Sequence, residues 1–223
     1  MEDGIRIQQM RPEEIQEKSF SIIREELKQM GIRLNPEEEP IIIRAIHTTA
    51  DFDYAENLIF SPSAVSAGIQ ALKQGAVVIT DTNMAKAGIN KKKLESLGGE
   101  VLCFMADEDV ALKAKERGCT RAAVSMEKAA RQFGIKRESM PERRPMIVAV
   151  GNAPTALIRL YELMEEGGFL PDLIIGVPVG FVNVVSSKEL MMGQEKVDYI
   201  IAKGRKGGSN VAAAIVNALL LMV

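Results

Sequence analysis

The residues of this 223-residue chain that could do chemistry gather around its single histidine, His47. The segment RAIHTTADFDY, residues 44–54, places that histidine after an arginine and ahead of Asp51 and Asp53. Because an imidazole exchanges protons near neutral pH, one histidine can act as a general acid or base. It can equally be a core or capping residue held by Asp51 or Asp53. The segment alone leaves both interpretations open.

Arg44 and His47 share one face of the helix that the sequence predicts from about Pro36 to Thr48. Residues three or four positions apart are neighbours on a helix, so a fixed cation lies beside the imidazole. The end of a helix favours a protonated histidine, whereas Arg44 disfavours it, and the sequence leaves that balance open. Asn35 is the expected cap of this helix.

Other common kinds of site lack their residues here. No second histidine accompanies His47, and Cys103 and Cys119 have no zinc or iron–sulfur spacing. The GRKGGS segment is not spaced as a Walker A loop, and no GxGxxG follows a predicted strand. The context of a Ser-His-Asp nucleophile is missing as well. We therefore expect no metal and no cofactor.

The composition argues against several kinds of partner. A net charge of −2 and the absence of tryptophan give no basic, aromatic surface for nucleic acid. The apolar tail Val211–Val223 is shorter than the roughly 20 residues that span a bilayer, so we expect a buried core helix and no membrane contact. The polar N-terminus is unlike a signal peptide, and both cysteines are expected to be buried, reduced thiols. These features predict a cytoplasmic protein.

Short apolar runs alternate with helical patterns from residue 76 onward. The expected strands are 76–80, 100–105, 146–150, 173–177 and 199–202, and the expected helices are 90–97, 108–117, 121–133, 153–166, 182–192 and 209–222. Continuous apolar strands joined by helices are typical of a parallel sheet buried on both faces. We predict an α/β fold over a single domain, residues 1–223, with a mainly parallel five-stranded sheet flanked by helices on both faces.

An N-terminal helical segment precedes this sheet. One helix is expected to start at Pro12 and to stop at Gly31, because proline favours the first helical position and glycine the end. A further helix is expected between Ser61, as its cap, and Gly75.

Four of the five predicted strands end in turns rich in glycine, asparagine or threonine, directly before a helix. These turns read TDTNM, VGNAPTA, GVPVGFVN and KGRKGGSN. Ligands of open parallel sheets bind at this edge, and backbone N–H groups at helix starts suit carboxylates or phosphates. The same residues also occur in ordinary turns and caps, so a ligand cleft is one of two open interpretations.

Several long motifs in one order resemble a known family. The segment from Arg44 to Ala76, RAIHTTADFDYAENLIFSPSAVSAGIQALKQGA, is similar to the signature of the precorrin-8X methylmutases. It is followed by TDTNMAKAGI, VGNAPTAL, IGVPVGFVNVVSSKE and KGRKGGSNVAAAIVNALL, and preceded by KSFSIIREE. The resemblance extends over nearly the full chain.

This resemblance implies an isomerase of cobalamin biosynthesis that works as a homodimer, with active sites near the subunit interface. The methyl group at C-11 of precorrin-8X, or of cobalt-precorrin-8, would move to C-12. The product would be hydrogenobyrinic acid or cobyrinic acid. The family's catalytic histidine matches His47, and its substrate-contacting serine and arginine match Ser19 and Arg44.

Two further residues are candidates for substrate contact. Asn83 and Arg121 lie near predicted strand ends in motifs similar to the family's, where loops are often functional. Their structural alternatives are a turn or cap residue for Asn83 and a surface arginine for Arg121. A flat tetrapyrrole fringed by carboxylates would need such cations and N–H donors around an apolar slot.

Two competing functions stay open from the sequence. A tetrapyrrole-binding carrier would hold the ring without converting it, and it would not require His47. A different α/β enzyme could act on a phosphorylated substrate, although the phosphate-loop fingerprints are missing. No residue reveals whether the ring already carries cobalt.

Overall fold

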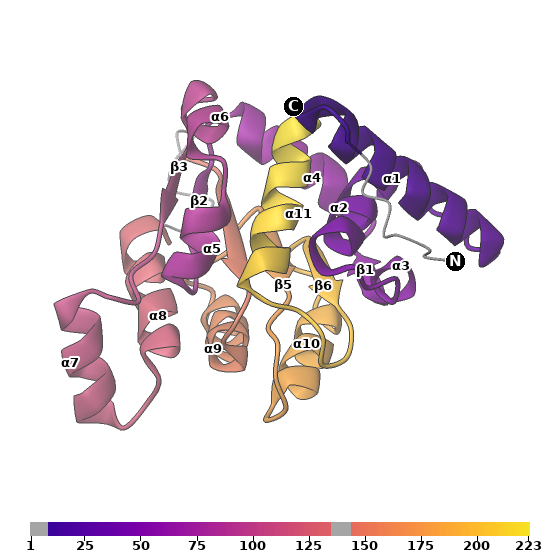
Figure 1. The fold of residues 1–223 in the computed structure, drawn as a ribbon. Coiled ribbons are helices and arrows are strands. Elements are labelled where there is room, and N and C mark those ends of the chain that lie inside the picture. Colours follow the sequence, from indigo (N-terminus) through magenta and orange to yellow (C-terminus); the bar gives the residue numbers. More distant parts are fainter. Residues whose placement is uncertain (1–8, 135–143) are drawn as a thin grey trace, which may run out of the picture.

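A computed structural model describes residues 9–134 and 144–223, and its centre is one six-stranded sheet (Figure 1). The strand order is β1-β6-β5-β4-β2-β3, and every neighbouring pair is parallel except β1 and β6. The strands are β1 (Leu58–Phe60), β2 (Val77–Thr80), β3 (Glu100–Leu102), β4 (Met146–Val150), β5 (Leu173–Gly176) and β6 (Tyr199–Ala202). The first eight residues, on which the signal-peptide argument partly depended, lie outside the described residues.

Helices cover both faces of the sheet. They are α1 (Pro12–Gln29), α2 (Glu39–Thr49), α3 (Tyr54–Asn57), α4 (Ala64–Lys73), α5 (Asn83–Gly88), α6 (Lys91–Ser96), α7 (Glu108–Arg117), α8 (Arg121–Phe133), α9 (Pro154–Glu165), α10 (Val184–Met192) and α11 (Ser209–Leu221). One face carries α2, α4, α5 and α11, with α1 packed on α2. The other carries α8, α9 and α10, with α7 beside α8.

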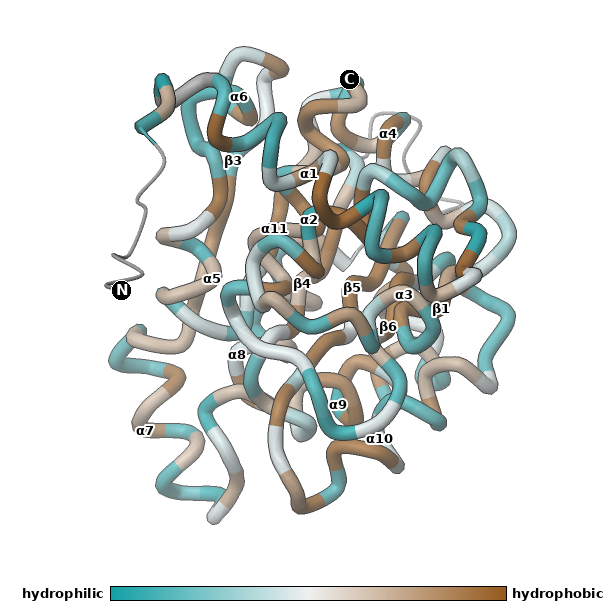
Figure 2. Tube along the Cα trace, turned by 45° about the vertical axis from the view of Figure 1, so that its right-hand side comes forward, coloured by the Kyte–Doolittle hydropathy of each residue, from teal (hydrophilic) through white to brown (hydrophobic). Residues whose placement is uncertain are grey.

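The alternation of side chains along each strand divides the core into these two layers. In β4, Ile147 and Ala149 face the α2–α11 layer, whereas Met146, Val148 and Val150 face the α9 layer. Successive residues of a strand point to opposite faces, so an apolar residue is needed at every position of a strand covered on both sides. Figure 2 shows the result as hydrophobic strands in the middle of the molecule.

Helix α11 lies at the centre of the first layer, between α2 and α5 (Figure 1). It is buried along nearly its whole length, as expected for the apolar tail. Asn217 of this helix donates to the carbonyl of Gly88 and accepts from the N–H of Asn90, each over 2.8 Å. These bonds fasten the end of α5 to α11.

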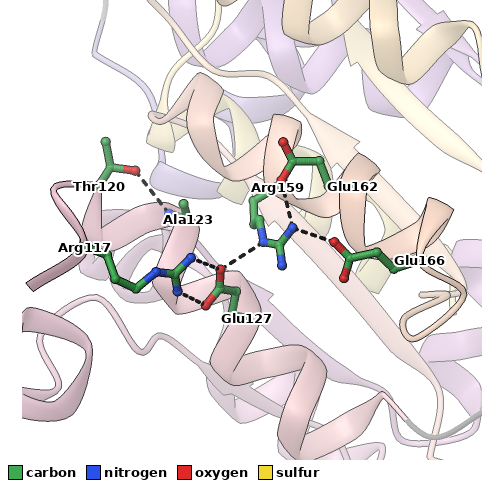
Figure 3. Close-up of polar contacts among 7 residues, drawn as sticks. All are labelled: Arg117, Thr120, Ala123, Glu127, Arg159, Glu162 and Glu166. Carbon is green, nitrogen blue, oxygen red and sulfur yellow. Dashed lines mark hydrogen bonds and ion pairs between the residues drawn. The ribbon is translucent and has the colours of Figure 1, made fainter. Parts of the chain in front are cut away.

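An ion-pair network holds the second layer together (Figure 3). Glu127 of α8 accepts from Arg117 of α7 at 2.6 and 3.0 Å and from Arg159 of α9 at 3.0 Å. Arg159 also donates to Glu162 and Glu166. The hydrogen bond from Arg117 lowers the pKa of the Glu127 carboxyl, although partial burial opposes this shift. Charges on three helices are therefore fixed on the face opposite α2.

The sequence predictions for the fold class, the mainly parallel sheet and the N-terminal helices are confirmed. The sheet has one strand more than expected, because the short antiparallel strand β1 was not recognised. Ser61, expected to cap a helix, instead donates to Asp198 at 2.6 Å and accepts from the N–H of Tyr199 at 2.9 Å. It joins β1 to β6, and α4 begins only at Ala64.

Three smaller expectations are wrong. The helix expected from Pro36 starts at Glu39, because Asn35 closes a separate turn with the N–H groups of residues 37–39. The strand expected to reach residue 105 ends at Leu102, where its pairing with β2 stops. Cys119 is exposed in the turn after α7, and Cys103 is only partly buried, although both thiols are free.

No helix in the described ranges is long and apolar enough to cross a membrane.

Candidate active site

His47 lies in the last turn of α2, with its side chain exposed to solvent. The ring of Phe20, from α1, meets the imidazole edge-on, with 5.2 Å between ring centroids and 87° between planes. The guanidinium carbon of Arg44 lies 5.5 Å from the centroid of the same phenyl ring. Phe20 therefore packs against both His47 and Arg44. The sequence analysis did not select Phe20, although it lies in the KSFSIIREE motif.

Arg44 is half-buried, and this burial lowers the pKa of its guanidinium. Within the described residues, no carboxylate pairs with it, so its charge is satisfied chiefly by the face of Phe20 and by solvent. A partly desolvated, unpaired guanidinium is well suited to a planar carboxylate, which it can bind through two parallel hydrogen bonds.

Ser19 precedes Phe20 on α1 and brings a hydroxyl to the same pair of helices. Its Oγ donates to the carbonyl of Ile15, 2.8 Å away within the same helix. A hydroxyl also has acceptor lone pairs and can rotate, so this bond does not exclude contact with a ligand. Ser19, Arg44 and His47 are thus contributed by two helices that pack together.

The two aspartates after α2 bind a lysine and do not hold His47. Lys206 lies 2.6 Å from a carboxylate oxygen of Asp51 and 2.6 Å from one of Asp53. The hydrogen bond from Lys206 lowers the pKa of the Asp51 carboxyl. Across the described ranges, His47 makes no hydrogen bond or ion pair, so the interpretation of a histidine held by these aspartates is wrong.

Lys206 belongs to a loop, residues 203–208, that joins β6 to α11 and that we call the strap. The ammonium group of Lys188, a fully buried residue of α10, donates to the strap carbonyls of Gly204 and Lys206 at 2.8 Å each. Burial lowers the pKa of Lys188 to about 8. The strap also lies so close to the residue after β5 that a Cβ on Gly207 would come within 2.1 Å of the Val177 carbonyl oxygen.

A buried carboxylate fills the turn between β4 and α9. Asp81, directly after β2, accepts hydrogen bonds from the N–H groups of Gly151, Asn152 and Ala153 at 2.8–2.9 Å. Burial raises the pKa of Asp81, and the three N–H donors oppose that rise. The idea that the VGNAPTA turn offers its N–H groups to a substrate carboxylate is therefore wrong, because the protein supplies that carboxylate itself.

Asn83 and Arg121 are both exposed but lie in different layers. Asn83 is the first residue of α5, which packs against α11 on the same side of the sheet as α2. Arg121 begins α8, where Thr120 caps the helix by accepting from the N–H of Ala123 (Figure 3). Because α8 covers the opposite face, Arg121 and His47 belong to different helical layers. Their contact with substrate stays a prediction.

The loop after β5 presents apolar side chains that sequence reasoning did not select. Phe181 is 82% exposed and Val182 is 80% exposed. The guanidinium carbon of Arg205, in the strap, lies 5.5 Å from the centroid of the Phe181 ring. An exposed aromatic ring beside a cation suits a ligand that has both an apolar face and acidic groups.

The sequence that carries these residues matches the model of a known protein family. The model for precorrin-8X methylmutase matches residues 14–222. The chain belongs to the precorrin-8X methylmutase family. Its members are isomerases of cobalamin biosynthesis.

Individual relatives agree with this family. A cobalt-precorrin-8 methylmutase of Leptospira interrogans serogroup Icterohaemorrhagiae serovar Lai is 43% identical over 213 residues, which cover 93% of this chain and 92% of the relative. A precorrin-8X methylmutase of Pseudomonas aeruginosa is 39% identical over 206 residues, covering 92% and 93% of the two chains. The solved precorrin-8X methylmutase of Thermus thermophilus superposes with a TM-score of 0.81 at 37% identity, covering 94% of this chain and 95% of that one.

No group of three or more metal-ligating side chains occurs in the described residues.

Asp81→Ala should destabilise the fold strongly, because it leaves three N–H groups of one turn without their acceptor. We expect the free energy of unfolding in urea to fall by about 3–5 kcal/mol. Asp81→Asn should lower the free energy of unfolding by less, since its side chain retains one acceptor oxygen. As a control, Asp109→Ala removes an exposed carboxylate of α7 and should change stability little. An equal loss in both alanine variants would contradict the role of Asp81.

Lys188 should make stability depend on pH. Its folded-state pKa of about 8 lies below the ordinary value of 10.5, so the unfolded chain binds more protons between these values and stability rises with pH. Relative to Lys188→Met, the free energy of unfolding of the unmodified chain should rise by about 2 kcal/mol from pH 7 to about pH 9.5. Urea titrations of both proteins across this range would test it. A constant difference would argue against the lowered pKa.

Proposed function

We propose that the chain moves the methyl group from C-11 to C-12 of precorrin-8X or cobalt-precorrin-8, giving hydrogenobyrinic acid or cobyrinic acid. The observation that carries this proposal is the exposed His47 beside Arg44, which pairs with no carboxylate among the described residues. Both lie against Phe20, in a chain of the precorrin-8X methylmutase family. An imidazole without a protein partner is free to exchange a proton with a ligand.

The reaction requires little from the protein beyond proton handling and orientation. A methyl shift within one ring system needs no external nucleophile and no nucleotide. In our proposal, protonated His47 donates a hydrogen bond or proton to the macrocycle near ring C and favours the electronic state in which the methyl group migrates. Arg44 and Ser19 orient the ring through its carboxylates. General acid assistance of this kind contributes about 10²–10⁴ in rate.

The surface at the carboxyl edge suits a flat ligand with acidic substituents. Arg44 and Arg205 supply cations, and Phe20 and Phe181 supply aromatic faces close to them. Apolar faces bind the ring plane, whereas guanidinium groups bind its acetate and propionate side chains. Asn83 and Arg121 are proposed as additional substrate contacts.

Precorrin-8X and cobalt-precorrin-8 are both candidate substrates. The relatives named for the cobalt form and for the metal-free form have similar identities to this chain, 43% and 39%. Turnover of precorrin-8X and of cobalt-precorrin-8 by the same preparation would decide between them.

We also propose that residues 1–223 act as one cytoplasmic domain and that two copies form a homodimer. Ile15 and Ile22 are exposed on α1, seven positions apart, with Ser19 between them on the same face. Exposed apolar side chains on one helical face favour a protein interface. A dimer through this face would place Ser19 near the boundary between the subunits.

His47→Ala should abolish most turnover while substrate still binds. We expect kcat to fall by about 10²–10⁴, because the group that exchanges the proton is lost. Formation of product can be followed by the absorbance change of the macrocycle, and binding by equilibrium dialysis. His47→Asn is the matched variant, since it keeps hydrogen bonding but cannot titrate.

Two outcomes would contradict the proposal in different ways. Nearly full turnover by His47→Ala would remove the proton role from His47. If the unmodified chain binds the macrocycle without converting it, the chain is a tetrapyrrole carrier.

The proposed dimer predicts a sedimenting species of twice the 24.4 kDa chain mass at micromolar concentration. The double variant Ile15→Glu/Ile22→Glu should sediment as a monomer, because it places charges on the proposed interface. Leu112→Glu, which alters an exposed apolar residue of α7, is the control and should not dissociate the dimer. A monomeric unmodified chain, or equal dissociation by the control, would refute this interface.

A further inference from the structure

The strap, residues 203–208, connects three parts of the molecule around the candidate active site. The N–H of Lys203 donates to the carbonyl of Asn57 at 2.7 Å, next to β1. The N–H of Gly208 donates to Val177 at 2.9 Å, at the end of β5. Lys188, a buried residue of α10, donates hydrogen bonds to two strap carbonyls. Its backbone is therefore fixed from several sides.

Lys206 is the strap residue that connects this fixed backbone to the end of α2. Its carbonyl oxygen accepts from buried Lys188, and its own ammonium group binds Asp51 and Asp53. Those aspartates lie in the turn that follows the last residue of α2, Thr49. The side chain of Lys206 thus links a fixed loop to the end of the helix that carries His47.

The turn that Lys206 binds is strained and needs support. Ala50 has a left-handed backbone conformation, with φ of 53°, which a non-glycine residue adopts at a cost of about 1 kcal/mol or more. Its N–H donates to the carbonyl of Ile46, and Asp51 accepts from the N–H of Asp53. Strain of this kind persists where the surroundings determine the backbone from several sides.

We propose that Lys206 is a positioning residue for His47. By binding Asp51 and Asp53, it fixes the turn that ends α2 and so the direction in which the imidazole projects. This inference rests on the proposed function of His47 for its kinetic consequence, but the geometric part can be tested without substrate.

The single histidine of the chain makes a direct test possible, because its ring C–H protons give one set of NMR signals. In Lys206→Met, which keeps an unbranched side chain and removes its charge, we expect the His47 signal to shift and broaden. Lys206→Arg should restore the original signal. Lys196→Met is the control, since it breaks another surface ion pair, with Glu165, and should leave the signal unchanged.

The kinetic arm distinguishes positioning from direct contact with substrate. Positioning predicts that Lys206→Met lowers kcat about tenfold or more with little change in KM. The variant Asp51→Asn/Asp53→Asn should have the same effect, and combining it with Lys206→Met should add no further loss. A Lys206 that binds substrate carboxylates would instead raise KM when removed, and the aspartate variant would leave kcat unaltered.

Each result decides one of the two proposals. An unchanged His47 signal in Lys206→Met overturns the positioning role, and so does a rise in KM with harmless aspartate variants. If His47→Ala keeps full turnover, the function proposed for His47 fails, while the NMR result still decides whether Lys206 holds the imidazole.

Discussion

A sheet that is buried on both faces leaves polar chemistry only at its edges, and the loops there must satisfy their own backbone groups. Two buried charges meet this constraint in complementary ways. The Asp81 carboxylate accepts three N–H groups of the turn after β4. The Lys188 ammonium donates to two carbonyls of the strap after β6. Each charged side chain makes hydrogen bonds to backbone groups that would otherwise need water as a partner.

These two solutions leave different surfaces for a ligand. The turn after β4 is closed, because an internal carboxylate already occupies the N–H groups that an external anion would use. Lys188 binds the strap through its backbone carbonyls. The side chains of Arg205 and Lys206 are therefore exposed and can contact other groups at the surface. Lys206 then reaches Asp51 and Asp53, and Arg205 lies over Phe181.

The sequence predicted what depends on local pattern. Apolar runs such as MIVAV, at 146–150, gave the buried strands, and the Arg44–His47 spacing gave the shared helical face. It could not predict contacts between distant segments. Lys206 and Asp51 are separated by more than 150 residues, and nothing local to GRKGGS reveals that its lysine binds an aspartate of another loop.

Buried charges were the second kind of feature that local patterns hid. Asp81 and Lys188 each stand in motifs that were quoted for other reasons, and charged residues are rarely buried unless paired. A general rule therefore assigns both to the surface. Their burial became evident only when the fold showed which backbone groups lacked partners. Similarly, β1 is only three residues long, and antiparallel pairing with β6 decides its conformation.

The separation of the two helical layers limits how a ligand can meet all of the candidate residues. His47, Arg44 and Ser19 lie on one side of the sheet, and Arg121 begins a helix on the other. The strands are hydrogen-bonded to one another and covered by apolar side chains on both faces, so a ligand does not pass through the sheet. A macrocycle that touches both sets must therefore extend around the carboxyl edge or receive Arg121 from a second copy of the chain. The second arrangement requires the edge to face a subunit boundary, whereas the first requires one chain to enclose the ring alone.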